Sequence, residues 1–227
     1  MSDQLQRQYF KLIVALATCA LLCLVCYDIF GGLWLKGITS TWFVLLGLVN
    51  MRYAKKKQTK DVKFIFWMVL GLLFGMCADV LLGIHFLLGI LFFASGHVFY
   101  LLAFYALDNF HLKDVLIIVP IACVSIYVVI GTPYICIEDP FLKKLLMGYA
   151  LIIASMLGKA ISNATTIKST SYYFILLGSI LFWFSDLMLA IDMFGEASRF
   201  TWVLCSYSYW PAQNMLALSI FHYVNEH

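Results

Sequence analysis

Eight stretches of this chain are apolar over about 20 residues, the length at which a helix crosses the hydrocarbon core of a bilayer. They lie near residues 11–30, 33–51, 64–84, 86–107, 114–132, 142–160, 172–194 and 200–222. Charged residues make up 12% of the chain, whereas a soluble domain carries about 25%. The sequence therefore predicts an all-α membrane protein, a bundle of about eight transmembrane helices that forms a single integral membrane domain over residues 1–227.

Charge and cysteine usage argue against several functional classes. The net charge is +3, and most basic residues fall in one short loop, so a nucleic-acid partner is not expected. Six of the seven cysteines fall in predicted spans. The Cys23-x-x-Cys26 pair lies on a membrane helix, so we interpret it as packing, and no metal-ligand pattern is present. We therefore expect neither a metal nor another cofactor.

The basic residues also predict how the chain is oriented. If the N-terminus is cytoplasmic, 11 Lys and Arg residues fall on the cytoplasmic side and 4 on the outer side. The first group is Arg7, Lys11, Arg52, Lys55, Lys56, Lys57, Lys60, Lys63, Lys113, Lys159 and Lys168, and the second is Lys36, Lys143, Lys144 and Arg199. Because Lys and Arg are in excess in cytoplasmic loops, we expect both termini in the cytoplasm. The short spans are typical of the endoplasmic reticulum, if the source cell is eukaryotic.

Two aspartates lie inside apolar runs, Asp79 in residues 71–82 and Asp186 in residues 177–190. An ionised Asp at the centre of a membrane helix costs about 2.5–3.5 kcal/mol on insertion scales, so such a residue indicates a functional site. The alternative is that each carboxylate only hydrogen-bonds to a neighbouring helix and stabilises the packing.

The two aspartates also belong to a weak internal repeat. Asp79 precedes Tyr100 by 21 residues, and Asp186 precedes Tyr207 by the same number. Four spans separate the two helices, so both cross in one direction, which predicts two parallel four-helix repeats with a site between them. At a rise of 1.5 Å per residue both carboxylates lie about 21–23 Å from the cytoplasmic edge. Two carboxylates at one depth can share one cavity.

Polar residues recur at helical spacing on neighbouring spans. His97 and Tyr100 share a face of the fourth span, and Tyr209 and Gln213 share a face of the last one. In the third span glycines at positions 71, 75 and 83 lie in the same row as Asp79. This smooth face allows close approach of another helix, or it leaves a groove for an acyl chain.

Four segments resemble the lysoplasmalogenase family, the YhhN-like membrane proteins: residues 75–82, 96–100, 182–190 and 209–213. The similar regions cover residues 71–104 and 176–219. The resemblance implies an eight-helix membrane hydrolase that splits the vinyl-ether bond of lysoplasmalogens with ethanolamine or choline head groups. The products would be a fatty aldehyde and a glycerophospho-alcohol. It also implies that Asp79 and Asp186 are the catalytic pair.

Vinyl-ether hydrolysis begins with protonation of the outer alkene carbon, after which water adds beside the ether oxygen and the hemiacetal collapses. One acid and one base are needed, as in glycoside hydrolysis, and two carboxylates can serve in either order. The candidate substrate-binding residues are His97, Tyr100, Tyr209 and Gln213, with Lys36 or Arg199 for the phosphate. The expected partners are a lysophospholipid substrate and membrane lipids. The alternative is a non-enzymatic lipid-binding protein or a proton-coupled transporter that uses the aspartates as a proton relay.

Overall fold

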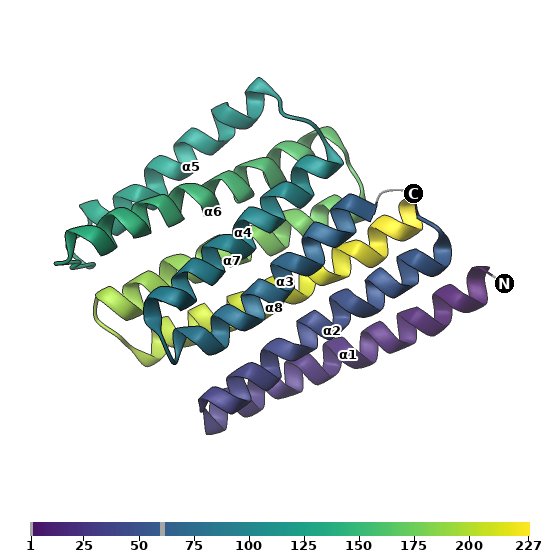
Figure 1. Ribbon diagram of the computed structural model, residues 1–227, viewed down its shortest axis with the longest axis horizontal. Coiled ribbons are helices and arrows are strands. Elements are labelled where there is room, and N and C mark those ends of the chain that lie inside the picture. The colour runs from purple at the N-terminus through teal and green to yellow at the C-terminus, as the bar shows by residue number, and fades with distance from the viewer. Residues whose placement is uncertain (1, 60–61) are drawn as a thin grey trace.

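The computed structural model describes residues 2–59 and 62–227, and within them it contains eight α-helices and no strands. The helices are α1 (Ser2–Phe30), α2 (Leu33–Lys57), α3 (Val62–Leu82), α4 (Phe86–Leu107), α5 (Leu112–Gly131), α6 (Pro140–Thr166), α7 (Thr170–Phe194) and α8 (Arg199–Glu226). Each predicted span coincides with one helix (Figure 1). The all-α prediction is therefore confirmed.

Several helices are longer than the apolar runs that predicted them. α1 begins at Ser2 and α2 continues to Lys57, with three lysines in its last turn. Counting apolar residues finds only the part of a helix that lies in hydrocarbon. The helix itself continues into the polar region as long as its backbone N–H and C=O groups are hydrogen-bonded. Lysines near a helix C-terminus also stabilise the helix, because their positive charge interacts favourably with the helix dipole. The residue after α2, Gln58, caps the helix with a left-handed backbone (φ 57°).

Among the described residues, seven helices are long and apolar enough to cross a membrane, namely α1 to α7. The chain is therefore an integral multi-pass membrane protein. α8 has 28 residues but a more polar sequence, and many of its polar side chains are buried, including Ser206, Ser208, Gln213 and Ser219. It packs mainly on α7 and α2. Its polar residues face protein, and for that reason α8 is less apolar than the helices around it.

The helix packing has the pattern of a repeat. The first helix of each half packs on the second, α1 on α2 and α5 on α6, and these pairs lie at opposite edges of the bundle (Figure 1). The second helix of each half packs on the third helix of its own half and on the fourth helix of the other half: α2 on α3 and α8, and α6 on α7 and α4. Each fourth helix therefore packs both on the third helix of its own half and on the second helix of the other half.

Two buried asparagines make equivalent bonds in the two halves. Asn50 on α2 donates its amide to the carbonyl of Ala217 on α8 at 2.8 Å, and Asn163 on α6 donates to the carbonyl of Phe104 on α4 at 2.9 Å. Both the donors and the acceptors are separated by 113 residues in the sequence. This agreement relates α2 to α6 and α4 to α8, in support of the predicted parallel repeats.

The 21-residue spacing, however, pairs Tyr100 with Tyr207, and these two residues do not occupy equivalent positions. Tyr100 is buried, whereas Tyr207 is 41% exposed and donates to Asp28 at 3.1 Å. The physical reason is that α7 continues eight residues past Asp186 but α3 only three past Asp79. Relative to its aspartate, α8 therefore begins later than α4. Residues at the same distance from the two aspartates in the sequence then lie at different positions along α4 and α8.

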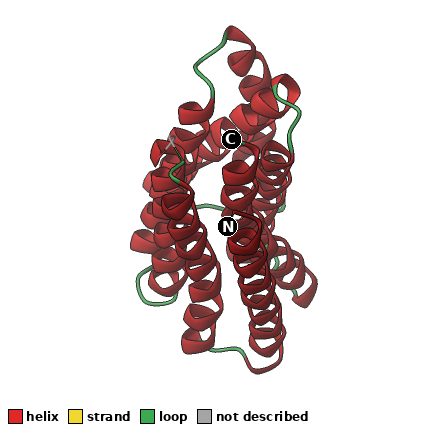
Figure 2. Ribbon diagram, turned by 90° about the vertical axis from the view of Figure 1, so that its right-hand side faces the viewer, coloured by secondary structure: helices red, strands yellow, loops and turns green. Residues whose placement is uncertain are grey.

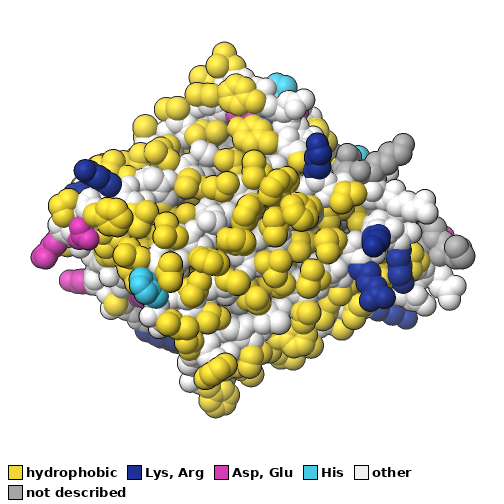
Figure 3. Space-filling view, in the orientation of Figure 1, with side chains coloured by type: hydrophobic (Ala, Val, Ile, Leu, Met, Phe, Trp, Pro, Cys, Tyr) yellow, Lys and Arg dark blue, Asp and Glu magenta, His cyan; other side chains and the backbone are white. Residues whose placement is uncertain are grey.

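Both termini lie at one end of the bundle, the end that faces the viewer in Figure 2. Hydrophobic side chains cover the middle of the face in Figure 3, and charged side chains gather at its two ends. Lys55, Lys56 and Lys57 close α2 at the end that carries the termini. Lys60, which the orientation argument also counts, lies outside the described residues.

Candidate functional site

A polar cavity at the end of the bundle opposite the termini is lined by both intramembrane carboxylates, Asp79 of α3 and Asp186 of α7. Its other polar or charged lining side chains include Lys36, Asp192 and Tyr209. The cavity has a volume of about 80 Å³, enough for several water molecules. The two aspartates that the sequence places at one depth are thus brought to one cavity.

Asp79 is 1% exposed and is surrounded by donors. Its Oδ2 accepts hydrogen bonds from Ser40 Oγ at 2.5 Å and from Tyr209 Oη at 2.7 Å. Its Oδ1 lies 3.5 Å from Lys36 Nζ. Trp210 Nε1 donates to Ser40 Oγ at 3.3 Å and so orients that hydroxyl. A cation and two hydroxyl donors each favour the ionised form of a buried carboxylate.

Asp186 has a different set of partners, which carry no permanent charge. Its Oδ2 accepts from Tyr149 Oη at 2.5 Å, and His97 Nε2 lies 3.1 Å from the same oxygen. His97 Nε2 is also 2.9 Å from Tyr149 Oη, and its Nδ1 lies 3.4 Å from Met156 Sδ. Asp186, Tyr149 and His97 therefore form a compact hydrogen-bonded triangle, within which a proton can be shared.

The partners of the two carboxylates occupy equivalent positions in the two halves. Lys36 on α2 and Tyr149 on α6 are separated by 113 residues, the same separation as His97 on α4 and Trp210 on α8. Lys36 and Tyr149 contact the carboxylate of their own half directly, while His97 and Trp210 reach the carboxylate region of the other half. Equivalent positions in the two halves thus surround both carboxylates, but with different chemistry. Asp79 has the cation of Lys36 beside it, whereas Asp186 has a phenol and an imidazole.

Four residues were predicted to bind substrate, and they do not all lie on the polar cavity. Tyr209 lines the polar cavity, whereas His97, Tyr100 and Gln213 do not. Tyr100 donates to Gln213 Oε1 at 2.5 Å, and Gln213 Nε2 donates to Tyr209 Oη at 3.2 Å. Tyr100 and Gln213 therefore lie behind Tyr209, in a hydrogen-bonded chain that ends at Asp79.

The glycine row of α3 is filled by this chain. A side chain at Gly71 would collide with the Tyr100 ring, and a Cβ at Gly75 would lie 2.5 Å from Gln213 Nε2. Gly83 faces Leu33 of α2. The row accommodates protein side chains behind the carboxylate, so the groove for an acyl chain that was considered for this face is absent.

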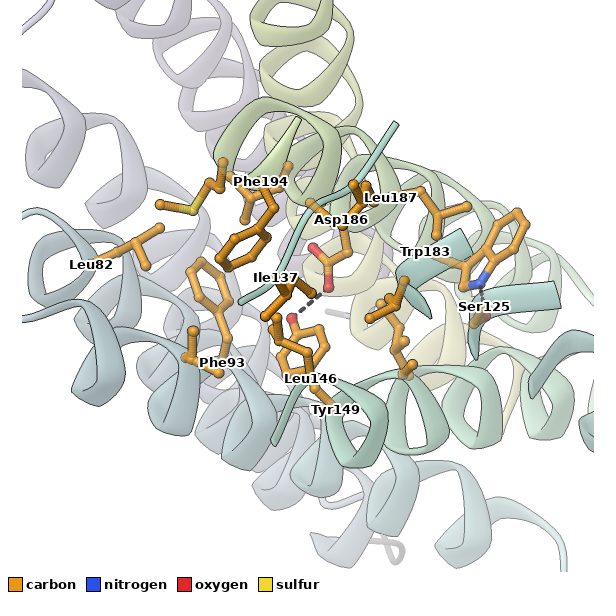
Figure 4. Close-up of a pocket in the computed structure, with 18 of the residues that line it drawn as sticks. Leu82, Phe93, Ser125, Ile137, Leu146, Tyr149, Trp183, Asp186, Leu187 and Phe194 are labelled. Atoms are coloured by element: carbon orange, nitrogen blue, oxygen red, sulfur yellow. Dashed lines mark hydrogen bonds between the residues drawn. The ribbon is translucent and has the colours of Figure 1, made fainter. Parts of the chain in front are cut away.

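An apolar cavity adjoins the polar one and is lined mainly by α4, α5, α6 and α7 (Figure 4). Leu82, Phe93, Asp186 and Leu189 line both cavities. In Figure 4 the Asp186 carboxylate points toward Tyr149 among apolar side chains. Asp186 therefore lies at the boundary between the polar cavity and the apolar one. The apolar cavity measures about 70 Å³.

The sequence did not point to Ser40 or Tyr149, and it suggested Lys36 or Arg199 for a phosphate. Lys36 lines the polar cavity but pairs with Asp79. Arg199 pairs with Asp28. Aligning the two halves with the 113-residue separation would have revealed Tyr149 opposite Lys36. Within residues 2–59 and 62–227, no group of three or more His, Cys, Asp or Glu is arranged to hold a metal ion.

Fold and site define a multi-pass helical membrane protein with two buried carboxylates on one internal cavity. The model of the YhhN family matches residues 34–220, and the chain belongs to this family, as its resemblance suggested. The matched region begins two residues before Lys36 and includes all of α3 to α7. Searches of curated proteins and of solved structures found no match.

Proposed function

We propose that this protein is a membrane hydrolase that cleaves the vinyl-ether bond of lysoplasmalogens, releasing a fatty aldehyde and a glycerophospho-alcohol. The family is associated with lysoplasmalogenase activity. The observation that carries the proposal is the placement of two differently partnered carboxylates on one polar cavity, one of them also bordering an apolar cavity. A vinyl ether likewise has a hydrocarbon side and a polar side.

In the proposed mechanism Asp186 is the acid. It borders the apolar cavity, where the chain-side alkene carbon would lie, and its partners Tyr149 and His97 lie within hydrogen-bond distance of its carboxyl group. Proton transfer to that carbon gives an oxocarbenium ion whose charge is shared with the ether oxygen. The acid thus acts on the hydrocarbon side of the bond.

Asp79 is the proposed base. Its carboxylate, held by Lys36, Ser40 and Tyr209, takes a proton from water as the water adds to the carbon beside the ether oxygen. When the hemiacetal collapses, its hydroxyl proton returns to Asp186 and Asp79 gives its proton to the departing glycerol oxygen. Both carboxyl groups are then in their starting states, and the net reaction consumes one water. Acid and base steps of this kind are each worth about 10² to 10⁴ in rate.

The first test is substrate choice. Purified protein should release aldehyde from a 1-alkenyl lysophospholipid, and it should leave the alkyl-ether analogue intact because that compound has no alkene carbon to protonate. In D₂O the released aldehyde should carry one deuterium on the carbon next to the carbonyl. Equal cleavage of an acyl lysophospholipid would identify an esterase instead. Ion or proton flux in liposomes without aldehyde release would favour the transporter.

We further propose that the chain forms one integral membrane domain with both termini in the cytoplasm, in the endoplasmic reticulum if the cell is eukaryotic. The excess of basic residues near the end with the termini supports this orientation. Tags added at residues 1 and 227 should both be protected from a luminal-side reagent in sealed vesicles and labelled once the membrane is permeabilised. Labelling of one tag alone before permeabilisation would contradict the even number of crossings.

A further inference from the structure

Asp192, in the last turn of α7, is a third carboxylate on the polar cavity. Asp79 has Lys36 beside it and Asp186 has His97, but no Lys, Arg or His of the described chain lies within ion-pair distance of Asp192. Its Oδ1 accepts a hydrogen bond from Thr201 Oγ1 at 2.8 Å, which orients the side chain. A carboxylate held on a cavity wall without a basic partner is suited to bind a cationic ligand group.

Aromatic rings also line this cavity. Tyr27, Trp202 and Trp210 all line it, and the Tyr27 ring lies 5.7 Å from the Trp202 ring and 5.2 Å from the Trp210 ring. Faces of Trp and Tyr attract ammonium groups, including quaternary ones that cannot donate a hydrogen bond. The Trp202 ring already has one such contact, because the guanidinium carbon of Arg199 lies 4.5 Å from its centroid.

The charges on the cavity wall favour the same kind of ligand. Asp79, Asp186 and Asp192 line the cavity, and Lys36 is the basic side chain among its lining residues. Even with Asp186 protonated, the wall carries one more negative than positive charge. A head group that carries only a phosphate would add to this excess, whereas an ammonium beside the phosphate compensates it.

We propose that Asp192, Tyr27 and Trp202 form an ammonium-binding subsite that selects lysolipids with an ethanolamine or choline head group. The proposal rests on the hydrolase function proposed above and assigns the head-group end of that substrate. Asp192 attracts the positive charge, the two rings form the walls, and the ether bond extends inward from the subsite to Asp79 and Asp186.

The test compares three alkenyl lysophospholipids with identical chains and with phosphoethanolamine, phosphocholine or phosphoglycerol head groups. Asp192→Asn removes the charge but retains an acceptor for Thr201. We expect kcat/KM for the two ammonium substrates to fall about tenfold, mostly through KM, because a charge-assisted contact is lost. The phosphoglycerol substrate should be unaffected. The ratio between substrates, measured in one preparation, does not depend on the fraction of protein that is folded.

Two further variants complete the test. Trp202→Leu should reduce kcat/KM more for the choline substrate than for the phosphoglycerol one. Glu196→Gln, which neutralises an exposed carboxylate four residues from Asp192, should leave all ratios unchanged. An equal effect of Asp192→Asn on all three substrates, or no effect on any, would overturn the subsite. Binding of the uncleavable alkyl-ether analogues, measured by isothermal titration in detergent, tests the subsite separately, so that a failure of the hydrolase proposal is recognised on its own.

Discussion

Asp79→Asn and Asp186→Asn are each expected to lower aldehyde release by about a hundredfold or more, since each removes one of two acid–base groups. Asparagine has nearly the same volume, and its amide can still bond to the hydroxyls of Ser40 and Tyr149. The protein should therefore remain folded, which its thermal unfolding in detergent would show. Turnover of a defined alkenyl lysophospholipid is the measurement.

The double variant distinguishes catalysis from packing. Two groups that act in one reaction are not additive, so the double variant should lose far less than the product of the two single losses. Asp139→Asn provides a matched control at the same end of the bundle. Asp139 caps α6 by accepting from the Phe141 amide at 2.8 Å, and asparagine caps a helix equally well. Near wild-type turnover in either folded single variant would remove that aspartate from the proposed site.

Much of the architecture can be predicted from the sequence because a bilayer admits few solutions. A run of about 20 apolar residues can satisfy its backbone in lipid only as a helix. For the same reason Asp79 and Asp186 are conspicuous, since a carboxylate in such a run needs partners. The eight helices follow from this reasoning without any knowledge of how they pack.

The partners of the carboxylates could not be predicted in the same way. Ser40 and Tyr149 contact the aspartates from other helices, and the contact depends on how each helix is rotated and shifted relative to its neighbour. Apolar patterning does not determine that rotation when protein and lipid are both apolar. The packing of each fourth helix against the other half has the same origin, and it brings His97 of α4 to Asp186 of α7 across a separation of 89 residues.

The chain also contains a buried ionic cluster away from the cavities, and the sequence reasoning counted its lysine only as a topological charge. Lys159 of α6 is 0% exposed, and its Nζ lies 3.0 Å from Asp114 Oδ2 and 2.6 Å from the carbonyl of Asn109. Asp114 also accepts a bond from Ser162. The cluster ties the connection between α4 and α5 to α6. Its geometry indicates a structural role.

Lys159→Met is therefore expected to destabilise the protein by about 3–5 kcal/mol, because it leaves the carboxylate of Asp114 buried without its cation. The midpoint of unfolding in detergent, followed by circular dichroism, measures the effect. Lys168→Met, at an exposed lysine in the turn after α6, is the matched control and should change stability little. The variant that combines Lys159→Met with Asp114→Asn should recover part of the loss, since the buried Asp114 carboxylate is then no longer left as an unpaired charge. If Lys159→Met unfolded at the same midpoint as wild type, the cluster would not hold these helices together. A loss of turnover in Lys159→Met that matched its loss of folded protein would agree with a structural role, whereas a selective loss in fully folded protein would connect this cluster to the reaction.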